Sequence, residues 1–569
     1  MSSKTSKLYV KASMMWAVTD DFPRQKGEAE RVGARRCRHP LSRLAGLFRE
    51  MVAGRVIGNS GPGDALIAAL RIPNLLQNLL GEGVLSASFV PVYSELLDED
   101  DPDEADRVAG AVGALLLVVT GLSVLVLVLA ARPITKLLAW GLTGDNFELA
   151  VDLTRIVAVG IGFMVMSAWC LGILTSHRHF FLPYVAPVVW NAVQIGALLL
   201  AWQRDWSIAD AARGLAIGVS IGGLVQLLIQ LPTVLRLARG LRFAFDNAHP
   251  RVREIRRRFG PAVLGRGAVQ LSAYLDLILA SFLAAGGLSA LFRAQILYTL
   301  PVSLFAMSVA AAELPELSRL TSDPAAVVQR TTAALRRIAF WMLASSLLLI
   351  AAGEHIIEFL FEGGEFTSAD TSLVWLIVAF YAIGLPAIGL SRMLQSASYA
   401  IGDTAGPARI AVLRVSIAAA VGLVVMFPLD RATVSAVGVD NLGDVLGFAG
   451  PLDADIRRDE SVVRLGAVGL ALGSAIGAWL ELFLLSRLVD RRLPGLPYPR
   501  RILIPPGVAA AVAFAVTAAL KLAVGDLPTL LAVLITVGVG GAVYVFVAFR
   551  TGVKEADMVL RPARRAIWR

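Results

Sequence analysis

Five polar residues recur within an otherwise apolar segment: Asp64, Arg71, Asn74, Asn78 and Glu82. At about 100° per residue, these positions fall within an arc of roughly 80° on one face of a single helix. An ionised side chain that faces lipid at mid-membrane costs about 2.5–3.5 kcal/mol, so this face is expected to border protein or a water-filled cavity. Pro73 lies among them and predicts a kink, because proline leaves one helical carbonyl without its donor.

The preceding segment adds Arg43, Arg49, Glu50 and Arg55. Four arginines, counting Arg71, therefore meet three acidic residues in two adjacent predicted helices. This surplus of positive charge favours an anionic ligand, since arginine binds phosphate and carboxylate groups through paired hydrogen bonds. The alternative interpretation is structural: the carboxylates neutralise the arginines and hold the helices together.

The second half of the chain repeats this pattern with Arg266, Asp276 and Arg293. Asp276 and Arg293 fall at similar depth on either side of a tight turn, so a salt bridge between them is a structural alternative for Arg293. Arg266 lies about 15 Å along its helix from Asp276 and has no sequence-near partner, which makes it the better candidate for contacting a substrate.

The elements that position these residues must lie in a membrane. Of the 569 residues, 56% are hydrophobic and only 17% are charged, and the mean hydropathy is +0.68. Such a composition exceeds what a soluble domain needs, and no segment alternates with the two-residue period of a membrane β-barrel. The sequence predicts an all-α polytopic membrane protein with about fourteen transmembrane helices.

Seven spans are uncharged and long enough to cross a ~30 Å hydrocarbon core: residues 108–131, 156–176, 180–203, 214–235, 371–391, 502–520 and 527–549. Seven weaker spans are interrupted by charge or proline: residues 41–58, 63–95, 259–284, 288–312, 337–353, 408–428 and 464–486. We expect the insert at 430–460, rich in Gly and Asp, to be an irregular external loop.

The net charge of +9 is concentrated in loops, with eight arginines in residues 236–258 alone. Placing alternate loops on opposite sides of the membrane collects the basic clusters on one side, which the positive-inside rule identifies as cytoplasmic. Both termini are then cytoplasmic, and nucleic acid is not expected as a partner. The basic linker has two interpretations: a helix that lies against acidic headgroups, or a loop that only sets topology.

These features predict five regions along the chain. They are a basic cytoplasmic leader (1–40), an N-terminal helix bundle (41–239), the basic cytoplasmic linker (240–258), a C-terminal helix bundle (259–493), and a C-terminal helix pair with a basic tail (494–569). The leader lacks the apolar core of a signal peptide, and we expect either a disordered arm or an over-extended gene start.

No motif of an enzyme is present. The chain lacks a G-x-x-x-x-G-K-[ST] phosphate loop, a nucleophile elbow and an H-E-x-x-H metal motif, and its two cysteines have no metal spacing. We therefore expect no cofactor, no metal and no catalysis. Arginines within apolar helices predict a transporter of something anionic and bulky, with an unknown coupling ion.

Six segments resemble the MurJ/MviN family, the lipid II flippases of the multidrug/oligosaccharidyl-lipid/polysaccharide exporter superfamily. In family order they are SRLAGLFRE (42–50), RIPNLLQNLLGEGVLSASFVPVYSE (71–95), HRHFFLPYVAPVVWN (177–191), LPELS (314–318), LFEGGEFT (360–367) and YAIGDTAGPAR (399–409). The similarity extends from Leu41 to about Phe549.

The resemblance implies two pseudo-symmetric six-helix bundles around a cationic cavity, with a C-terminal helix pair. It implies a flippase that moves undecaprenyl-pyrophosphate-linked peptidoglycan precursor from the inner to the outer leaflet of a bacterial cytoplasmic membrane. Alternating access, driven by an ion or the membrane potential, is the implied mechanism. Membrane lipids and proteins of cell-wall synthesis are the implied partners.

The resemblance also assigns candidate substrate-binding residues, although three positions depart from the family pattern. Positions that family members use in the cavity are occupied here by Arg43, Arg49, Asp64, Asn74, Glu82 and Ser289. Gln77, Ile296 and Thr299 stand where the family has charged residues. Either Arg71, Arg266 and Arg293 restore the positive field from other positions, or the affinity or identity of the substrate has changed.

Two alternatives to lipid II transport stay open. One is a transporter of another polyprenyl-diphosphate glycan or of a drug-like cation. The other is a membrane scaffold for cell-wall synthesis that transports nothing, which the departures at Gln77, Ile296 and Thr299 favour.

Overall fold

The computed structural model describes most of the chain from residue 39 onward. Outside the described residues lie 1–38, 100, 247, 436–437, 442, 444, 446–449, 525–526 and 568–569, and the side chains of 39–41, 264–273 and 561–567. The chain forms two compact units. The N-terminal unit contains the described residues up to Ser289 together with Gly364–Phe366, and the C-terminal unit contains Ala290–Gly363 and the described residues from Thr367 on.

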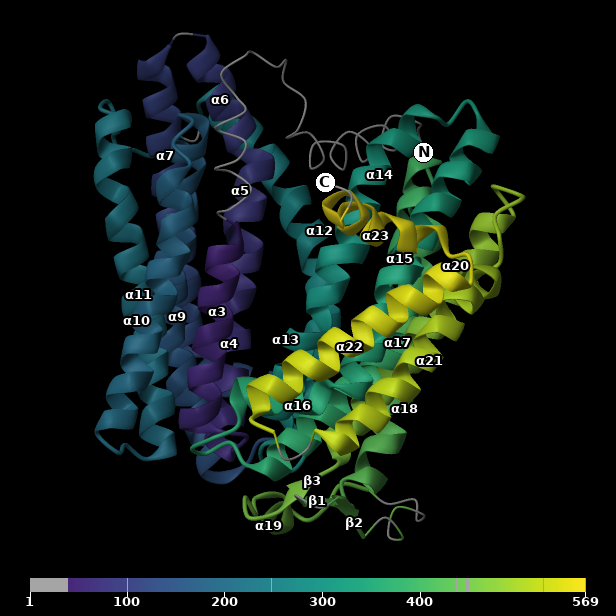
Figure 1. The fold of residues 1–569 in the computed structure, drawn as a ribbon. Helices are drawn as coiled ribbons and strands as arrows, with labels where there is room; N and C mark the ends of the chain where they lie inside the picture. The colour runs from purple at the N-terminus through teal and green to yellow at the C-terminus, as the bar shows by residue number, and fades with distance from the viewer. Residues whose placement is uncertain are drawn as a thin grey trace. The chain divides into compact units, whose positions relative to one another are not determined.

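The N-terminal unit is entirely helical in its regular structure (Figure 1). Its helices are α3 (His39–Ile57), α4 (Gly61–Leu80), α5 (Glu82–Ser88), α6 (Val90–Asp98), α7 (Pro102–Leu129), α8 (Ala131–Leu138), α9 (Gly144–Ser176), α10 (Phe181–Gln203), α11 (Ile208–Leu237) and α12 (Pro250–Ala280), followed by the first turn of α13 (Gly287–Pro301).

Helix α9 is the core of the N-terminal unit, because α4, α7, α8 and α11 all pack against it. Its charged residues lie in its first half, and residues 156–176 are uncharged and mostly buried, as expected of a helix at the centre of a bundle. Two polar side chains of α11 bond to α9, because the amide N–H groups of both Gln226 and Gln230 donate to the Ser167 hydroxyl at 3.0 Å. Such bonds join helices in an environment that offers no water to replace them.

The C-terminal unit is also helical. After α13 come the π-helical turn η1 (Val302–Met307), α14 (Ser308–Arg319), α15 (Pro324–Ala351), α16 (Gly353–Phe361), α17 (Ser368–Ala400), α18 (Ala405–Leu429), α19 (Ala454–Arg457), α20 (Gly466–Asp490), α21 (Pro499–Ala523), α22 (Thr529–Arg550) and α23 (Lys554–Ile567). Short strands β1 (Thr433–Ser435), β2 (Gly438–Asp440) and β3 (Val463–Arg464) lie between α18 and α20.

Helix α17 is the counterpart of α9, because α14, α15, α16 and α20 pack against it. Helices α18 and α20 approach closely along a seam of small residues. A Cβ atom at Gly473 would lie 2.5 Å from the carbonyl oxygen of Ala418, so only glycine permits this approach. Helices α21 and α22 form a pair (Figure 1). The pair joins the unit through α15, where the Tyr544 hydroxyl donates to the Phe340 carbonyl at 2.7 Å.

The predicted all-α membrane fold is confirmed, but the predicted count of fourteen spans is not. Twelve helical segments among the described residues are long and apolar enough to cross a membrane. Helix α3 does not meet that measure because its 19 residues include Arg43, Arg49, Glu50 and Arg55. Ten central side chains of α12 fall outside the described residues.

The insert differs from the irregular loop predicted for it. Its described residues include an antiparallel sheet of three strands in the order β2-β1-β3, which β3 joins from just beyond the predicted boundary. Each strand has only two or three residues, so the alternation that identifies a strand in a sequence is too short to recognise here.

The linker also differs in detail from its prediction. Residues 250–258 are not a separate element but the first turns of α12, which continues to Ala280. The predicted boundaries at 239 and 259 stay predictions, as do the cytoplasmic termini. Residues 1–38 of the predicted leader lie outside the described residues.

Candidate functional site

The single helix predicted for the polar residues between 64 and 82 is interrupted. Helix α4 ends at Leu80, and Gly81 takes an extended conformation, so Glu82 begins a separate helix. The prediction of one continuous helix is therefore wrong at this end. Along α4, Asp64 is buried, Arg71 and Asn78 are half-buried, and Asn74 is exposed; Glu82 is exposed on α5. Exposed polar atoms thus gather toward the end of α4.

Pro73 does not end α4, which continues for seven residues beyond it. In the same turn, the Tyr274 hydroxyl of α12 donates a hydrogen bond of 3.0 Å to the Arg71 carbonyl. The carbonyl that Pro73 deprives of its helical donor is that of Ala69, four residues earlier. The Tyr274 bond therefore joins α12 to α4 beside the proline and does not replace the missing bond.

Asp64 is a hydrogen-bond acceptor at the beginning of α13. One of its carboxylate oxygens accepts from the Gly286 N–H at 2.8 Å, and the other accepts from both the N–H and the hydroxyl of Ser289 at 2.7 Å. Only 4% of Asp64 and 1% of Ser289 is exposed. A carboxylate at the N-terminus of a helix is favoured by the free N–H groups and the helix dipole. The structure thus brings these two predicted site residues together.

Arg49 lies in a small polar cluster between α3 and α10. It pairs with Glu50, donates to the Gln194 amide oxygen at 3.3 Å, and has its guanidinium 5.4 Å from the ring centroid of Trp190. Arg49 and Glu50 point about 100° apart on an ideal helix, but their long side chains still meet. This pairing neutralises Arg49, as in the structural alternative, but it joins two residues of one helix.

Arg43 differs from Arg49 because its side chain is exposed and makes no ion pair with any residue that the structure describes. Arg293 is buried in the C-terminal unit, with 5% exposed. The side chain of Arg266 lies outside the described residues, so its predicted role stays a prediction. The predicted salt bridge between Asp276 and Arg293 also stays a prediction.

A second polar network, in the C-terminal unit, was not among the predicted site residues. Arg414 of α18 lies 3.0 Å from Glu481 of α20, and Gln395 of α17 donates to the other oxygen of that carboxylate at 2.8 Å. Arg392 donates to the Gln395 amide oxygen at 3.1 Å. Arg414 therefore contacts the carboxylate directly, whereas Arg392 is linked to it through Gln395.

The sequence contained a signal for this network. Arg414 and Glu481 are isolated charges within predicted spans, and such residues mark functional or structural sites in membranes. The signal was missed because the partners are 67 residues apart, and spacing along one helix cannot pair them.

The three positions that depart from the family pattern, Gln77, Ile296 and Thr299, hold uncharged side chains. The Thr299 hydroxyl donates to the carbonyl of Gln295 in its own helix at 2.7 Å. Gln77 is half-buried on α4, and Ile296 is half-buried on α13. The sequence-based concern about these three positions therefore stays open.

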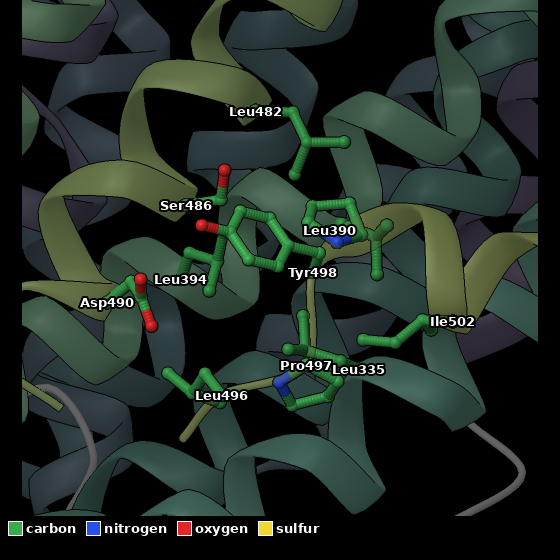
Figure 2. A pocket seen from close by; sticks show the side chains of 11 residues that line it. Leu335, Leu390, Leu394, Leu482, Ser486, Asp490, Leu496, Pro497, Tyr498 and Ile502 are labelled. Atoms are coloured by element: carbon green, nitrogen blue, oxygen red, sulfur yellow. The ribbon is translucent and has the colours of Figure 1, made fainter. Parts of the chain in front are cut away.

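A pocket in the C-terminal unit contains none of the predicted site residues. Figure 2 shows Tyr498 and Pro497 of the segment before α21 among leucines of α15, α17 and α20. Its lining residues are Leu335, Leu390, Leu394, Leu482, Ser486, Asp490, Leu496, Pro497, Tyr498, Pro499 and Ile502. It is mostly apolar, with one carboxylate. Across the described chain, no three His, Cys, Asp or Glu side chains are grouped so as to hold a metal ion.

Comparison with known proteins identifies relatives along most of the chain. Residues 54–438 match the family described as "Lipid II flippase MurJ". A protein of Bdellovibrio bacteriovorus named "Probable lipid II flippase MurJ" is 32% identical over 394 residues, which cover 68% of this chain and 74% of that protein. The "Lipid II flippase MurJ" of Burkholderia cenocepacia is 31% identical, over 65% of this chain and 73% of that protein.

Two solved structures have similar folds. One is a lipid II flippase MurJ in an inward closed conformation, with a TM-score of 0.67 and 22% identity, covering 90% of this chain and 97% of that one. The other is an inward-facing multidrug resistance transporter of the MATE family, with a TM-score of 0.58 and 13% identity, covering 86% and 98%. At these identities the similarity concerns the fold alone.

Proposed function

This chain belongs to the lipid II flippase MurJ family, and we propose that it moves lipid-linked peptidoglycan precursor from the inner to the outer leaflet of a bacterial cytoplasmic membrane. Family membership carries the proposal, since the family match covers residues 54–438. The membrane fold supports it, because twelve described segments can span a bilayer.

The proposed mechanism is alternating access without ATP. The diphosphate of the substrate is held by arginines and the polyprenyl tail stays in the surrounding lipid. Arg43 is the strongest candidate for the diphosphate contact because its exposed guanidinium makes no ion pair among the described residues. Guanidinium groups bind phosphate oxygens through two parallel charge-assisted bonds, which suits this role.

Arg49 plays a different part in this proposal. The Glu50 carboxylate offsets the positive charge of Arg49, so Arg49 attracts an anionic substrate less than an unpaired arginine does. Asp64 and Ser289 keep the beginning of α13 in place through three hydrogen bonds. The contributions of Arg71, Asn74, Glu82, Arg266 and Arg293 to substrate binding stay proposals from family position and charge.

The test is to replace an established flippase by this chain in a depletable bacterial strain. The readouts are survival and the amount of lipid II accessible from outside. The parent chain is expected to restore both, and Arg43→Ala is expected to restore neither, whereas Arg204→Ala, at an exposed arginine outside the site, should behave as the parent does.

Each alternative has its own outcome. Survival without externally accessible lipid II would support a scaffold that transports nothing. Absence of both, with the chain present and folded in the membrane, would contradict lipid II as the substrate and favour another lipid-linked glycan or a cation.

A further inference from the structure

The segment between α11 and α12 presents a surface of arginines. Of the eight arginines in residues 236–258, six are exposed and make no ion pair with any residue that the structure describes. These six, which we call the arginine face, are Arg236, Arg239, Arg242, Arg253, Arg256 and Arg257. We propose that the arginine face binds anionic phospholipid headgroups of the membrane that α11 crosses.

Contacts with α7 and α9 fix the orientation of the linker, and so determine which of its side chains are exposed. The Gly240 N–H donates to the Asp106 carboxylate of α7 at 2.7 Å. A Cβ atom at Gly110 would lie 2.1 Å from the Arg242 carbonyl oxygen, so the linker lies directly against α7 at a position that needs glycine. Phe243 packs against Trp169 of α9, with ring centroids 5.7 Å apart.

The first turns of α12 are fixed in the same way. Val252 and Ile255 are buried, and Arg251 donates to both carboxylate oxygens of Glu99 at 2.9 and 3.1 Å. Arg258 pairs with Glu254 within the helix. These contacts turn one side of the helix toward α6 and the rest of the unit, and they leave Arg253, Arg256 and Arg257 on its exposed side.

The position and chemistry of this surface fit lipid. Helix α11 is long and apolar enough to cross a membrane and ends at Leu237, so the linker directly follows a candidate span. Phe245 is 64% exposed next to the arginines, and an exposed apolar ring beside basic residues suits the boundary between headgroups and acyl chains. Basic residues just outside a span are attracted to anionic lipid, and arginine adds direct bonds to the phosphate oxygens.

The test places a reporter on the linker itself. Ala244 is exposed, and Ala244→Cys in a background of Cys37→Ala and Cys170→Ala carries a bimane label. The full chain is placed in nanodiscs of phosphatidylcholine with increasing phosphatidylglycerol, one of the two lipids being brominated at a time. Quenching is expected to rise with brominated phosphatidylglycerol well beyond its share of the lipid, and not with brominated phosphatidylcholine.

Variants then identify the arginines responsible. The triple variant Arg253→Gln, Arg256→Gln and Arg257→Gln is expected to lose most of the quenching that depends on phosphatidylglycerol. The pair Arg239→Gln and Arg242→Gln tests the linker separately, so that one misfolded variant does not decide the question. Arg204→Gln, which follows α10 at the other end of α11, is the matched control and should change nothing.

Three results would overturn the proposal. They are equal quenching by the two brominated lipids, unchanged quenching in both sets of variants, and a label that responds to an added oligonucleotide but not to phosphatidylglycerol. None of them bears on lipid II transport, so this proposal and the proposed function fail separately.

Discussion

Each unit has an arginine–glutamate pair in its interior that also involves a glutamine: Arg49–Glu50 in the N-terminal unit and Arg414–Glu481 in the C-terminal unit. In each pair, a glutamine of a neighbouring helix forms a hydrogen bond with one member: Gln194 with Arg49, and Gln395 with Glu481. The first pair is formed by consecutive residues of one helix, with 19% and 12% of the side chains exposed. The second joins α18 to α20, and its glutamate side chain is only 2% exposed.

The Arg49–Glu50 pair therefore offsets charge within one helix, whereas the Arg414–Glu481 pair holds two helices together. A buried carboxylate depends on its partner, because an unpaired charge in a low-dielectric interior is costly. A pair within one helix, partly exposed, loses less when one member is removed. The same residue types therefore have different consequences, and the following substitutions distinguish them.

The largest effect is expected at the C-terminal pair. Arg414→Leu should lower the free energy of unfolding by about 3–5 kcal/mol, because it leaves the Glu481 carboxylate buried with only Gln395 as a partner. Unfolding in mixed micelles of increasing SDS content measures this change. The double variant Arg414→Leu with Glu481→Leu is the control, and it should recover much of the loss. A single variant as stable as the parent would contradict the assignment.

Asp64 provides an intermediate case, because it is as buried as Glu481 but accepts its bonds chiefly from backbone and hydroxyl donors. Asp64→Ala removes the acceptor of two buried N–H groups and should cost about 2–3 kcal/mol. Asp64→Asn retains one acceptor oxygen and should cost less. The same SDS titration tests the order, and equal losses in the two variants would show that charge, rather than hydrogen bonding, governs this site, because both variants lack the carboxylate charge.

The N-terminal pair is expected to lose less. Arg49→Ala should reduce stability by about 1–2 kcal/mol, between the values for exposed and buried pairs. Glu50→Gln retains most of the volume and should cost less still, while it increases the net positive charge beside Arg49. If Arg49→Ala instead matched Arg414→Leu in the SDS titration, the distinction between the two pairs would be lost.

The sequence predicted the fold class well because membrane spans need only length and apolarity, both of which are local. The uncharged runs at 371–391 and 502–520 lie inside α17 and α21, as predicted. The break at Gly81 was not predicted, because residue type alone does not reveal the backbone angles of a glycine. The sheet between α18 and α20 escaped prediction because its strands are too short to show a period.

The candidate site was predictable in part. Residue type and helical spacing predicted that Asp64 faces protein or a water-filled cavity, but not its donors at Gly286 and Ser289, which are 222 and 225 residues away. Likewise, Arg414 and Glu481 were visible as isolated charges and not as a pair. Local patterns identify polar residues that need a partner, whereas the partner is determined by packing.

Arg43 should show the smallest effect on stability and a large effect on function. Its side chain is exposed and makes no ion pair among the described residues, so Arg43→Ala should change the free energy of unfolding by no more than about 0.5 kcal/mol. If Arg43 contacts the diphosphate, the same variant should fail to restore survival to a flippase-depleted strain. Arg43→Lys separates the two possible contributions of the side chain, because it keeps the charge and loses the paired hydrogen bonds. Full activity of Arg43→Lys with an inactive Arg43→Ala would show that Arg43 contributes its positive charge and not its paired hydrogen bonds. Full activity of both variants would show that Arg43 is not part of the site.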